Sequence, residues 1–192
     1  MCIRDRRYTA ENRSFTPDYI NEINRKDRQA MINAYDNSIV ATDWLLDQLI
    51  ERLDRTGKTS ALLYLSDHGE DLLDDDRDRF LHASPIPTYY QLHIPFVLWF
   101  SPQYVSQFPL DTQQAREQHK TPFDSRVVFH TLLSIGGIET DYRIDSLSLV
   151  SPSFHLDKRY YLGERNIPVP VKYLPFDDED RQAFERHGIA PR

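Results

Sequence analysis

Residues 61–70 read Ala-Leu-Leu-Tyr-Leu-Ser-Asp-His-Gly-Glu, an apolar run that stops at an Asp-His pair followed by glycine. A short, fully apolar stretch bounded by turn residues is typical of a buried strand in a parallel sheet. Ligands collect beyond the carboxyl ends of such strands. The sequence therefore predicts an α/β fold with a mainly parallel central sheet, and it places Asp67 and His68 where chemistry takes place.

Asp67 and His68 are candidate zinc ligands. Neighbouring residues on a regular strand point to opposite faces, so the pair can share one ion only where the backbone leaves extended geometry, which Gly69 tolerates. A carboxylate oxygen and an imidazole nitrogen both bind zinc well, and catalytic zinc sites keep a position open for water or substrate. The alternative is a strand-to-helix turn in which Asp67 is a solvated cap and His68 an ordinary surface residue.

A long helix is predicted directly before this strand, over residues 27–55. Apolar side chains recur there at three- and four-residue steps, as a buried helix face requires. They are Met31, Tyr35, Ile39, Leu45, Leu46, Leu49 and Leu53. Thr56 and Gly57 are suited to end the helix. Helix and strand together form a unit typical of a parallel sheet.

Several other polar residues are interpreted as structural. Asp36, Asn37 and Asp43 on the long helix are expected to cap, to hydrogen-bond neighbouring loops or to face solvent. His130 is expected to be a satisfied helix histidine, and His119 to be solvated. None of these is assigned to a metal site.

The remaining elements follow from runs of apolar residues and from proline and glycine positions. We predict a strand over 94–100, an irregular excursion over 103–125, a helix over 126–135, a strand over 159–163, an extended segment over 167–171 and a short helix over 176–187.

Composition limits the class of protein. The chain has 192 residues, of which 40% are hydrophobic and 28% charged, enough for one domain. The net charge of −7 argues against a nucleic-acid partner, because neutralising phosphates requires clustered Lys and Arg. Cys2 is the only cysteine, so no internal disulfide can form. The apolar runs are far shorter than the ~18 residues of a membrane-spanning helix, and no signal peptide is evident.

The motifs around Asp67 and His68 carry a resemblance to a known family. They are Ser-Asp-His-Gly-Glu at 66–70, Leu-His-Ala-Ser-Pro at 81–85, the segment 91–102, Ala-Tyr-Asp-Asn-Ser-Ile at 34–39, and Phe-His-Thr-Leu-Leu at 129–133. In their order along the chain they resemble the phosphoethanolamine transferases of the alkaline phosphatase and sulfatase superfamily, which include enzymes that modify lipid A. The likeness extends over roughly residues 7 to 150.

The resemblance implies an alkaline phosphatase-like sandwich of which this chain carries only the C-terminal part. Residues 7–192 would be the C-terminal part of a single sulfatase-like catalytic domain, and 1–6 a non-native start. Asp67 and His68 would hold the Zn²⁺ that activates a threonine nucleophile. His82 would be catalytic, binding a second metal or the substrate phosphate, and His93 would be mainly structural. The chain departs from the family in its longer, acidic segment 71–79 and in Ala83, where a glycine is usual.

The function that the resemblance implies is the metal-dependent transfer of phosphoethanolamine. The donor would be phosphatidylethanolamine and the acceptor an envelope glycolipid or glycan, with a phospho-enzyme intermediate. By likeness to the family, the nucleophile segment and a membrane-anchoring N-terminal region lie outside this chain, so the fragment alone is expected to be inactive. The whole protein is expected in the inner membrane with a periplasmic catalytic domain. Alternatives are a sulfatase or phosphodiesterase-type hydrolase of the same superfamily, and a non-catalytic binding protein that retains the fold.

Overall fold

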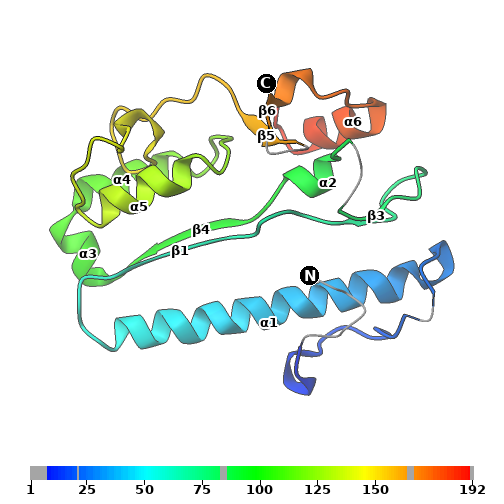
Figure 1. Ribbon diagram of the computed structural model, residues 1–192. Coiled ribbons are helices and arrows are strands. Elements are labelled where there is room, and N and C mark those ends of the chain that lie inside the picture. Colours follow the sequence, from blue (N-terminus) through cyan, green and yellow to red (C-terminus); the bar gives the residue numbers. More distant parts are fainter. Residues whose placement is uncertain (1–7, 21, 83–85, 164–166, 191–192) are drawn as a thin grey trace.

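The computed structural model describes residues 8–20, 22–82, 86–163 and 167–190. A long helix, α1, runs along one side of a two-stranded sheet, and helices α2 to α6 lie on the opposite side of that sheet (Figure 1). The helices are α1 (Arg28–Asp54), α2 (Tyr89–Leu92), α3 (Pro102–Gln107), α4 (Pro109–Glu117), α5 (Val127–Ile135) and α6 (Asp178–Arg186). The strands are β1 (Ala61–Leu65), β2 (Asp71–Leu72), β3 (Phe80–Leu81), β4 (Phe96–Phe100), β5 (Tyr160–Leu162) and β6 (Pro168–Pro170). The expected boundary after residue 6 lies outside the described residues.

Helix α1 confirms the helix predicted over 27–55. Its first half is the buried part, with Met31 fully buried and Ala34 1% exposed. Asn37 is also fully buried, and its side-chain oxygen accepts hydrogen bonds from the backbone N–H groups of Ser14 and Phe15, each 2.8 Å long. Asn37 therefore fixes the N-terminal segment against α1, a structural role as expected from the sequence.

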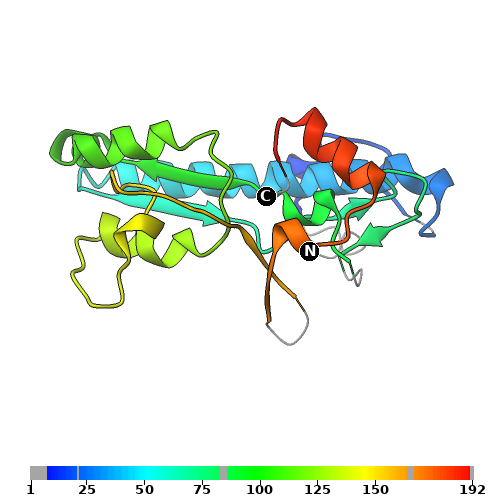
Figure 2. The same cartoon turned by 90° about the horizontal axis from the view of Figure 1, so that it is seen from above.

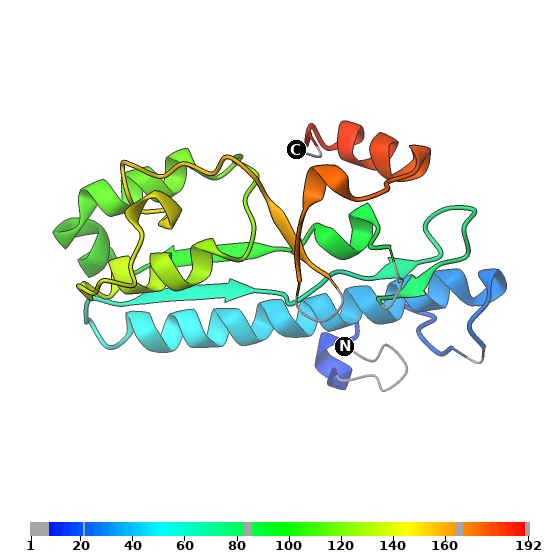
Figure 3. The same ribbon diagram turned by 45° about the horizontal axis from the view of Figure 1, so that its top comes forward.

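The pairing of β1 differs from the prediction, because its described neighbour is antiparallel. Ala61 lies opposite Phe100, and Leu65 opposite Phe96. A parallel neighbour needs a crossover connection that returns the chain to the other end of the strand. Residues 66–95 instead form the hairpin β2–β3 and the short helix α2 beyond the end of β1, and the chain re-enters the sheet from that end (Figure 3). The end of β1 and the start of β4 consequently share one edge.

The segment 103–125 is largely helical, so the predicted irregular excursion is wrong for most of it. Pro102 and Pro109 occupy the first turns of α3 and α4. Proline suits this position because the missing N–H would have no helical partner there. The Ser101 side chain accepts a hydrogen bond from the N–H of Tyr104 and caps α3. The prolines start these helices, whereas the prediction took the proline content of 103–125 as a sign of irregular structure.

The C-terminal part follows the sequence more closely. Strands β5 and β6 form a hairpin, and α6 covers α2 (Figure 3). A buried cluster joins these elements and consists of Tyr89, Val171, Phe176, Ala183 and Phe184. Seen from above, α3 to α5 and the α2–α6 pair lie over opposite ends of α1 (Figure 2). In the described part of the chain, no helix combines the length and apolar character needed to cross a membrane.

Candidate metal centre

The Asp-His-Gly-Glu motif leaves the end of β1 and is held against α2 by its glycine. The Gly69 N–H donates a 2.9 Å hydrogen bond to the carbonyl of Gln91. A Cβ atom at position 69 would lie 1.9 Å from the Tyr90 carbonyl oxygen. Glycine is therefore required for the close approach of two backbone segments, a reason different from the change of backbone direction that the sequence suggested.

His68 and Asp67 form the first pair of the site. The His68 Nδ1 atom lies 3.0 Å from the Gly69 carbonyl oxygen, and His68 Nε2 lies 3.7 Å from Asp67 Oδ2. Because a carbonyl can only accept, Nδ1 carries the proton and the lone pair is on Nε2, facing the carboxylate. A zinc ion about 2.0–2.2 Å from each atom fits this separation. The structure thus brings together the two ligands predicted from the sequence, on the exposed side of the motif.

Burial and nearby charge shift the pKa of Asp67 in opposite directions. Partial burial raises the pKa of Asp67, but the nearby His68 and the backbone N–H groups of residues 67 and 68 outweigh this and lower it overall. The carboxylate is therefore ionised at neutral pH, as a zinc ligand must be.

His82 and Glu70 form the second pair. His82 Nδ1 lies 3.0 Å from both carboxylate oxygens of Glu70, whose side chain is only 3% exposed. The carboxylate accepts the proton of Nδ1, so Nε2 of His82 is left for a metal or a substrate. The rings of His68 and His82 are 3.6 Å apart between centroids. One ligand atom from each of His68, Glu70 and His82 lies within 4.8 Å of the others, a group able to hold a metal ion.

The hairpin β2–β3 explains why Glu70 and His82 meet. Its register pairs Asp71 with Leu81 and Leu72 with Phe80, so residues 70 and 82 occupy the next opposing positions. Leu81, immediately before His82, has a φ of 63°, a left-handed conformation that is costly for a non-glycine residue. Backbone strain therefore accompanies the placement of His82.

Glu70 was not selected by the sequence interpretation, although it belongs to the quoted motif. A glutamate after glycine is ordinarily solvated, and its partner is twelve residues away in the sequence. The signal that would have identified it is the antiparallel register of two very short strands, which no periodicity in the sequence reveals.

The acidic segment after the motif is a structural feature of the fold. Arg77 donates to Asp177 at 2.6 Å and to Asp180 at 2.8 Å, and it also bonds Asp75. Asp180 in turn accepts a 3.0 Å bond from the N–H of Tyr89, the first residue of α2. The Arg77 network therefore ties the segment 73–79 to α2 and α6.

A buried polar layer supports the other side of α2. Asp71 is 2% exposed and accepts hydrogen bonds from the Thr88 hydroxyl, at 2.7 Å, and from the Gln91 side-chain amide. Burial raises the pKa of Asp71, and the two hydrogen bonds counteract that rise. These contacts fix α2 to the hairpin that carries Glu70 and His82.

The remaining histidines lie outside the metal group. His130 is buried, and its Nδ1 accepts a 3.1 Å hydrogen bond from the N–H of Ile144, which confirms the satisfied helix histidine. His119 is exposed, as expected. His93 Nδ1 lies 2.7 Å from the Tyr89 hydroxyl, and its ring contributes to the wall of a large pocket. The mainly structural role of His93 stays a prediction, and the bond to Tyr89 agrees with it.

Comparison with known proteins gives consistent matches. The sulfatase family model matches residues 4–138. Phosphoethanolamine transferase EptA of Escherichia coli K12 is 36% identical over 142 residues, which are 71% of this chain and 26% of that protein. The soluble domain of lipooligosaccharide phosphoethanolamine transferase A from Neisseria meningitidis superimposes with a TM-score of 0.66 at 32% identity, over 74% of this chain and 44% of that one.

A further match is to the C-terminal periplasmic domain of EptC from Escherichia coli. It has a TM-score of 0.74 at 24% identity, over 94% of this chain and 51% of that domain. The same domain in complex with Zn gives 0.65 at 23% identity, with the same coverage. The chain thus spans about a quarter of the length of the curated relatives and about half of this solved domain.

Proposed function

Because this chain belongs to the sulfatase family, we propose that the site at the end of β1 binds zinc and serves the transfer of phosphoethanolamine from phosphatidylethanolamine to an envelope glycolipid or glycan. The structural matches confirm the alkaline phosphatase-like fold expected from the sequence. The matched relatives are phosphoethanolamine transferases, and the family resemblance stated from the motifs is likewise confirmed.

The observation that supports the chemistry is the meeting of two ligand pairs. Asp67 lies beside His68, and ligand atoms of His68, Glu70 and His82 lie within 4.8 Å of one another beyond the end of β1. This donor set suits zinc, which prefers imidazole nitrogen and carboxylate oxygen. In the proposal, Asp67 Oδ2 and His68 Nε2 hold the ion.

Zinc, when bound, lowers the pKa of a nucleophilic hydroxyl and neutralises charge on a phosphoryl group. The chain's own residues have the complementary tasks. His82 presents Nε2 to the phosphoryl group or to the leaving oxygen, and the buried Glu70 fixes the orientation of the imidazole. Orientation by a buried carboxylate distinguishes His82 from the solvated His119.

The proposal also covers the setting of the reaction. The relatives are periplasmic domains or integral membrane proteins by description, which supports an inner-membrane protein with a periplasmic catalytic domain. The donor is then a membrane phospholipid and the acceptor an envelope glycolipid or glycan, and a chain of net charge −7 is a poor partner for nucleic acid.

Zinc binding to the chain tests the ligand assignment. We expect His68→Ala to weaken zinc binding about tenfold or more, and Glu70→Gln to weaken it roughly 10- to 100-fold if Glu70 orients a ligand, as supporting carboxylates do. Isothermal titration of the metal-free chain measures both. His130→Ala is the matched control, because this histidine is buried, bonded to the N–H of Ile144 and not part of the group that could hold a metal. Equal losses at positions 68 and 130 would contradict the site.

The transfer reaction is tested in a membrane enzyme of known activity. Residues 7–150 would replace the matching segment of Escherichia coli EptA, and lipid A from cells producing this graft would be analysed by mass spectrometry. We expect lipid A to gain the mass of one phosphoethanolamine group, and the gain to disappear with His68→Ala in a protein that still reaches the membrane. A graft that instead releases sulfate from an aryl sulfate ester would favour the hydrolase alternative and contradict the transferase.

A further inference from the structure

Helix α2 holds the Asp-His-Gly-Glu motif at the residues on either side of Glu70. The Gly69 N–H donates a 2.9 Å hydrogen bond to the carbonyl of Gln91, the third residue of α2. Asp71 accepts a 2.7 Å hydrogen bond from the Thr88 hydroxyl and a second bond from the Gln91 side-chain amide. The main chain of Glu70 is therefore fixed against α2 both before and after this residue.

The three side chains that make these contacts, Asp71, Thr88 and Gln91, are buried, and we call them the α2 clamp. A buried carboxylate is costly unless hydrogen-bond donors satisfy it, so the two donors determine where Asp71 lies. The Thr88 hydroxyl also accepts a bond from the N–H of Gln91 and caps α2. The first turn of α2 and the position of Asp71 are therefore fixed by the same contacts.

Glu70, immediately before β2, and Asp71, its first residue, direct their side chains to different neighbours. Successive side chains of a strand alternate between its two faces. Asp71 contacts α2, while both carboxylate oxygens of the buried Glu70 lie 3.0 Å from His82 Nδ1. Because the two residues are joined by one peptide bond, a shift of Asp71 would move the Glu70 carboxylate relative to His82.

Asp71 is also connected to His82 through the hairpin. In the β2–β3 register Asp71 lies opposite Leu81, which immediately precedes His82. Asp71 is thus adjacent to Glu70 along the chain and adjacent to the His82 segment across the ladder. The α2 clamp therefore acts at the one position of β2 that neighbours both members of this pair.

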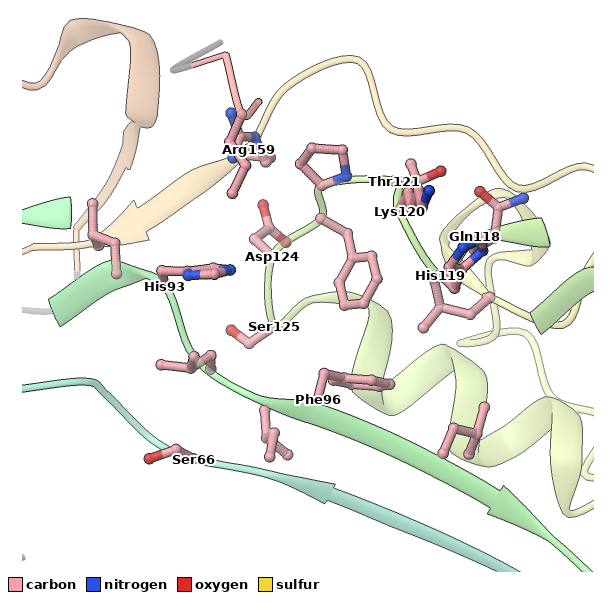
Figure 4. A pocket seen from close by; sticks show the side chains of 18 of the residues that line it. Ser66, His93, Phe96, Gln118, His119, Lys120, Thr121, Asp124, Ser125 and Arg159 are labelled. Carbon is pink, nitrogen blue, oxygen red and sulfur yellow. The ribbon is translucent and has the colours of Figure 1, made fainter. Parts of the chain in front are cut away.

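The clamp also places α2 beside the candidate metal centre. Ser66, which follows β1, and His93, which follows α2, line one large pocket (Figure 4). His68 and Gln91 belong to the same lining. The hydrogen bonds of Asp71 thus join the segment that carries the predicted metal ligands to the helix that forms a neighbouring wall.

We propose that Asp71 is a positioning residue of the metal centre: through Thr88 and Gln91 it holds the Glu70 carboxylate where this carboxylate keeps the proton of His82 on Nδ1. The inference deepens the proposed function, because it takes Glu70 and His82 as parts of the proposed site. Asp71 is buried, so it acts through Glu70 and does not itself meet the substrate. A role in stability alone would leave the choice of protonated nitrogen in the folded chain unchanged.

The first measurement is the tautomer of His82 in the metal-free chain, read from long-range proton–nitrogen correlation spectra at a pH at which the imidazole is neutral. We expect the wild type to carry the proton on Nδ1, which faces Glu70. Asp71→Ala and Thr88→Val should both mix in the form protonated on Nε2, because the Glu70 carboxylate is held less firmly. Thr88→Val only replaces a hydroxyl with a methyl group, so it keeps the test open if Asp71→Ala does not fold.

The second measurement is zinc affinity, by isothermal titration of the metal-free chain. Asp71→Ala should weaken zinc binding about tenfold, the lower end of the effect of residues that support a metal ligand. In a Glu70→Gln background the same change should weaken binding by less than about twofold more, because two changes that act through one contact are not additive. Asp71→Asn keeps an acceptor for Gln91 and can donate to the Thr88 hydroxyl, so it should retain more affinity than Asp71→Ala.

Thr131→Val is the matched control for Thr88→Val. Both threonines are fully buried, and Thr131 accepts a 3.0 Å hydrogen bond from the N–H of Leu149. This control should leave the tautomer and the zinc affinity unchanged. An equal loss in Thr131→Val would overturn the inference, as would a His82 protonated on Nε2 in the wild type, or wild-type tautomer and affinity in both Thr88→Val and Asp71→Ala.

The two proposals can fail separately. If the His82 tautomer depends on Asp71 in a chain that does not bind zinc, or whose graft shows no transfer, the positioning role is supported and only the proposed function is contradicted. If His68→Ala abolishes zinc binding and transfer while the Asp71 and Thr88 variants behave as wild type, the proposed function is supported and the positioning role is contradicted.

Discussion

Replacing His82 with alanine is expected to lower the turnover number of phosphoethanolamine transfer by about 10²- to 10³-fold, with little change in KM. A group that acts on the transferring phosphoryl stabilises the transition state more than the bound substrate, so its loss appears in kcat. The measurement is the initial rate of transfer by the EptA graft, at several donor concentrations.

Glu70→Gln tests whether the contact between Glu70 and His82 affects the rate. Glu70 contacts His82 through both carboxylate oxygens, so replacing the carboxylate with an amide should also lower kcat, by about 10- to 100-fold. His130→Ala should leave kcat unchanged, because its ring accepts a hydrogen bond from the N–H of Ile144 and has a structural role. A kcat that survives His82→Ala, or a loss confined to KM, would remove His82 from the reaction.

The second large effect is expected for Arg77→Met, which should lower the free energy of unfolding of the chain by about 3–5 kcal/mol. Arg77 is 14% exposed and joins Asp75, Asp177 and Asp180, so its loss leaves three carboxylates close together without their cation. Urea unfolding followed by tryptophan fluorescence measures the change.

Arg55→Met is the matched control for this prediction. Arg55 pairs with Glu51 one turn away on α1 and is 78% exposed, so its loss should cost less than about 0.5 kcal/mol. If Arg77→Met lowers the free energy of unfolding no more than Arg55→Met does, the role of the Arg77 network in stability is contradicted.

The pH dependence of stability gives an independent check of the role of Arg77. Hydrogen bonds from Arg77 lower the pKa of Asp75, so the stability from this pair is present above the unfolded-state pKa of about 3.9 and is lost as pH falls through the lower folded-state value. The difference in stability between wild type and Arg77→Met should therefore narrow below about pH 4. A difference that grows in acid would contradict this explanation.

The parts of the fold that depend on local patterns were predictable from the sequence. The periodic apolar face gave α1 within one residue at each end, and the run at 61–65 gave β1 as a strand. The polar residues at the end of β1 indicated the candidate site, because the carboxyl end of a strand and a glycine are both visible in sequence. In the structure His68 Nε2 lies 3.7 Å from Asp67 Oδ2, and the assignment of the two residues as metal ligands stays a prediction.

What could not be predicted depends on contacts between distant segments. The antiparallel partner of β1 follows from the path of residues 66–95, whose hairpin has only two residues in each strand. Glu70 can be identified as the partner of His82 only when that register is known. The role of Arg77 depends on Asp177 and Asp180, which are about a hundred residues away in the sequence. Such partners have no signature in a single sequence.

The register of the β2–β3 hairpin has a consequence for recognising distant relatives of this chain. Glu70 and His82 face each other because they extend a two-rung ladder, while residues 73–79 form only its tip. Lengthening or shortening that tip changes the number of residues between His68 and His82 and leaves the ladder intact. A search pattern with a fixed gap between them would thus discard genuine relatives, whereas one that keeps Asp-His-Gly-Glu and a later histidine with a variable gap would retain them.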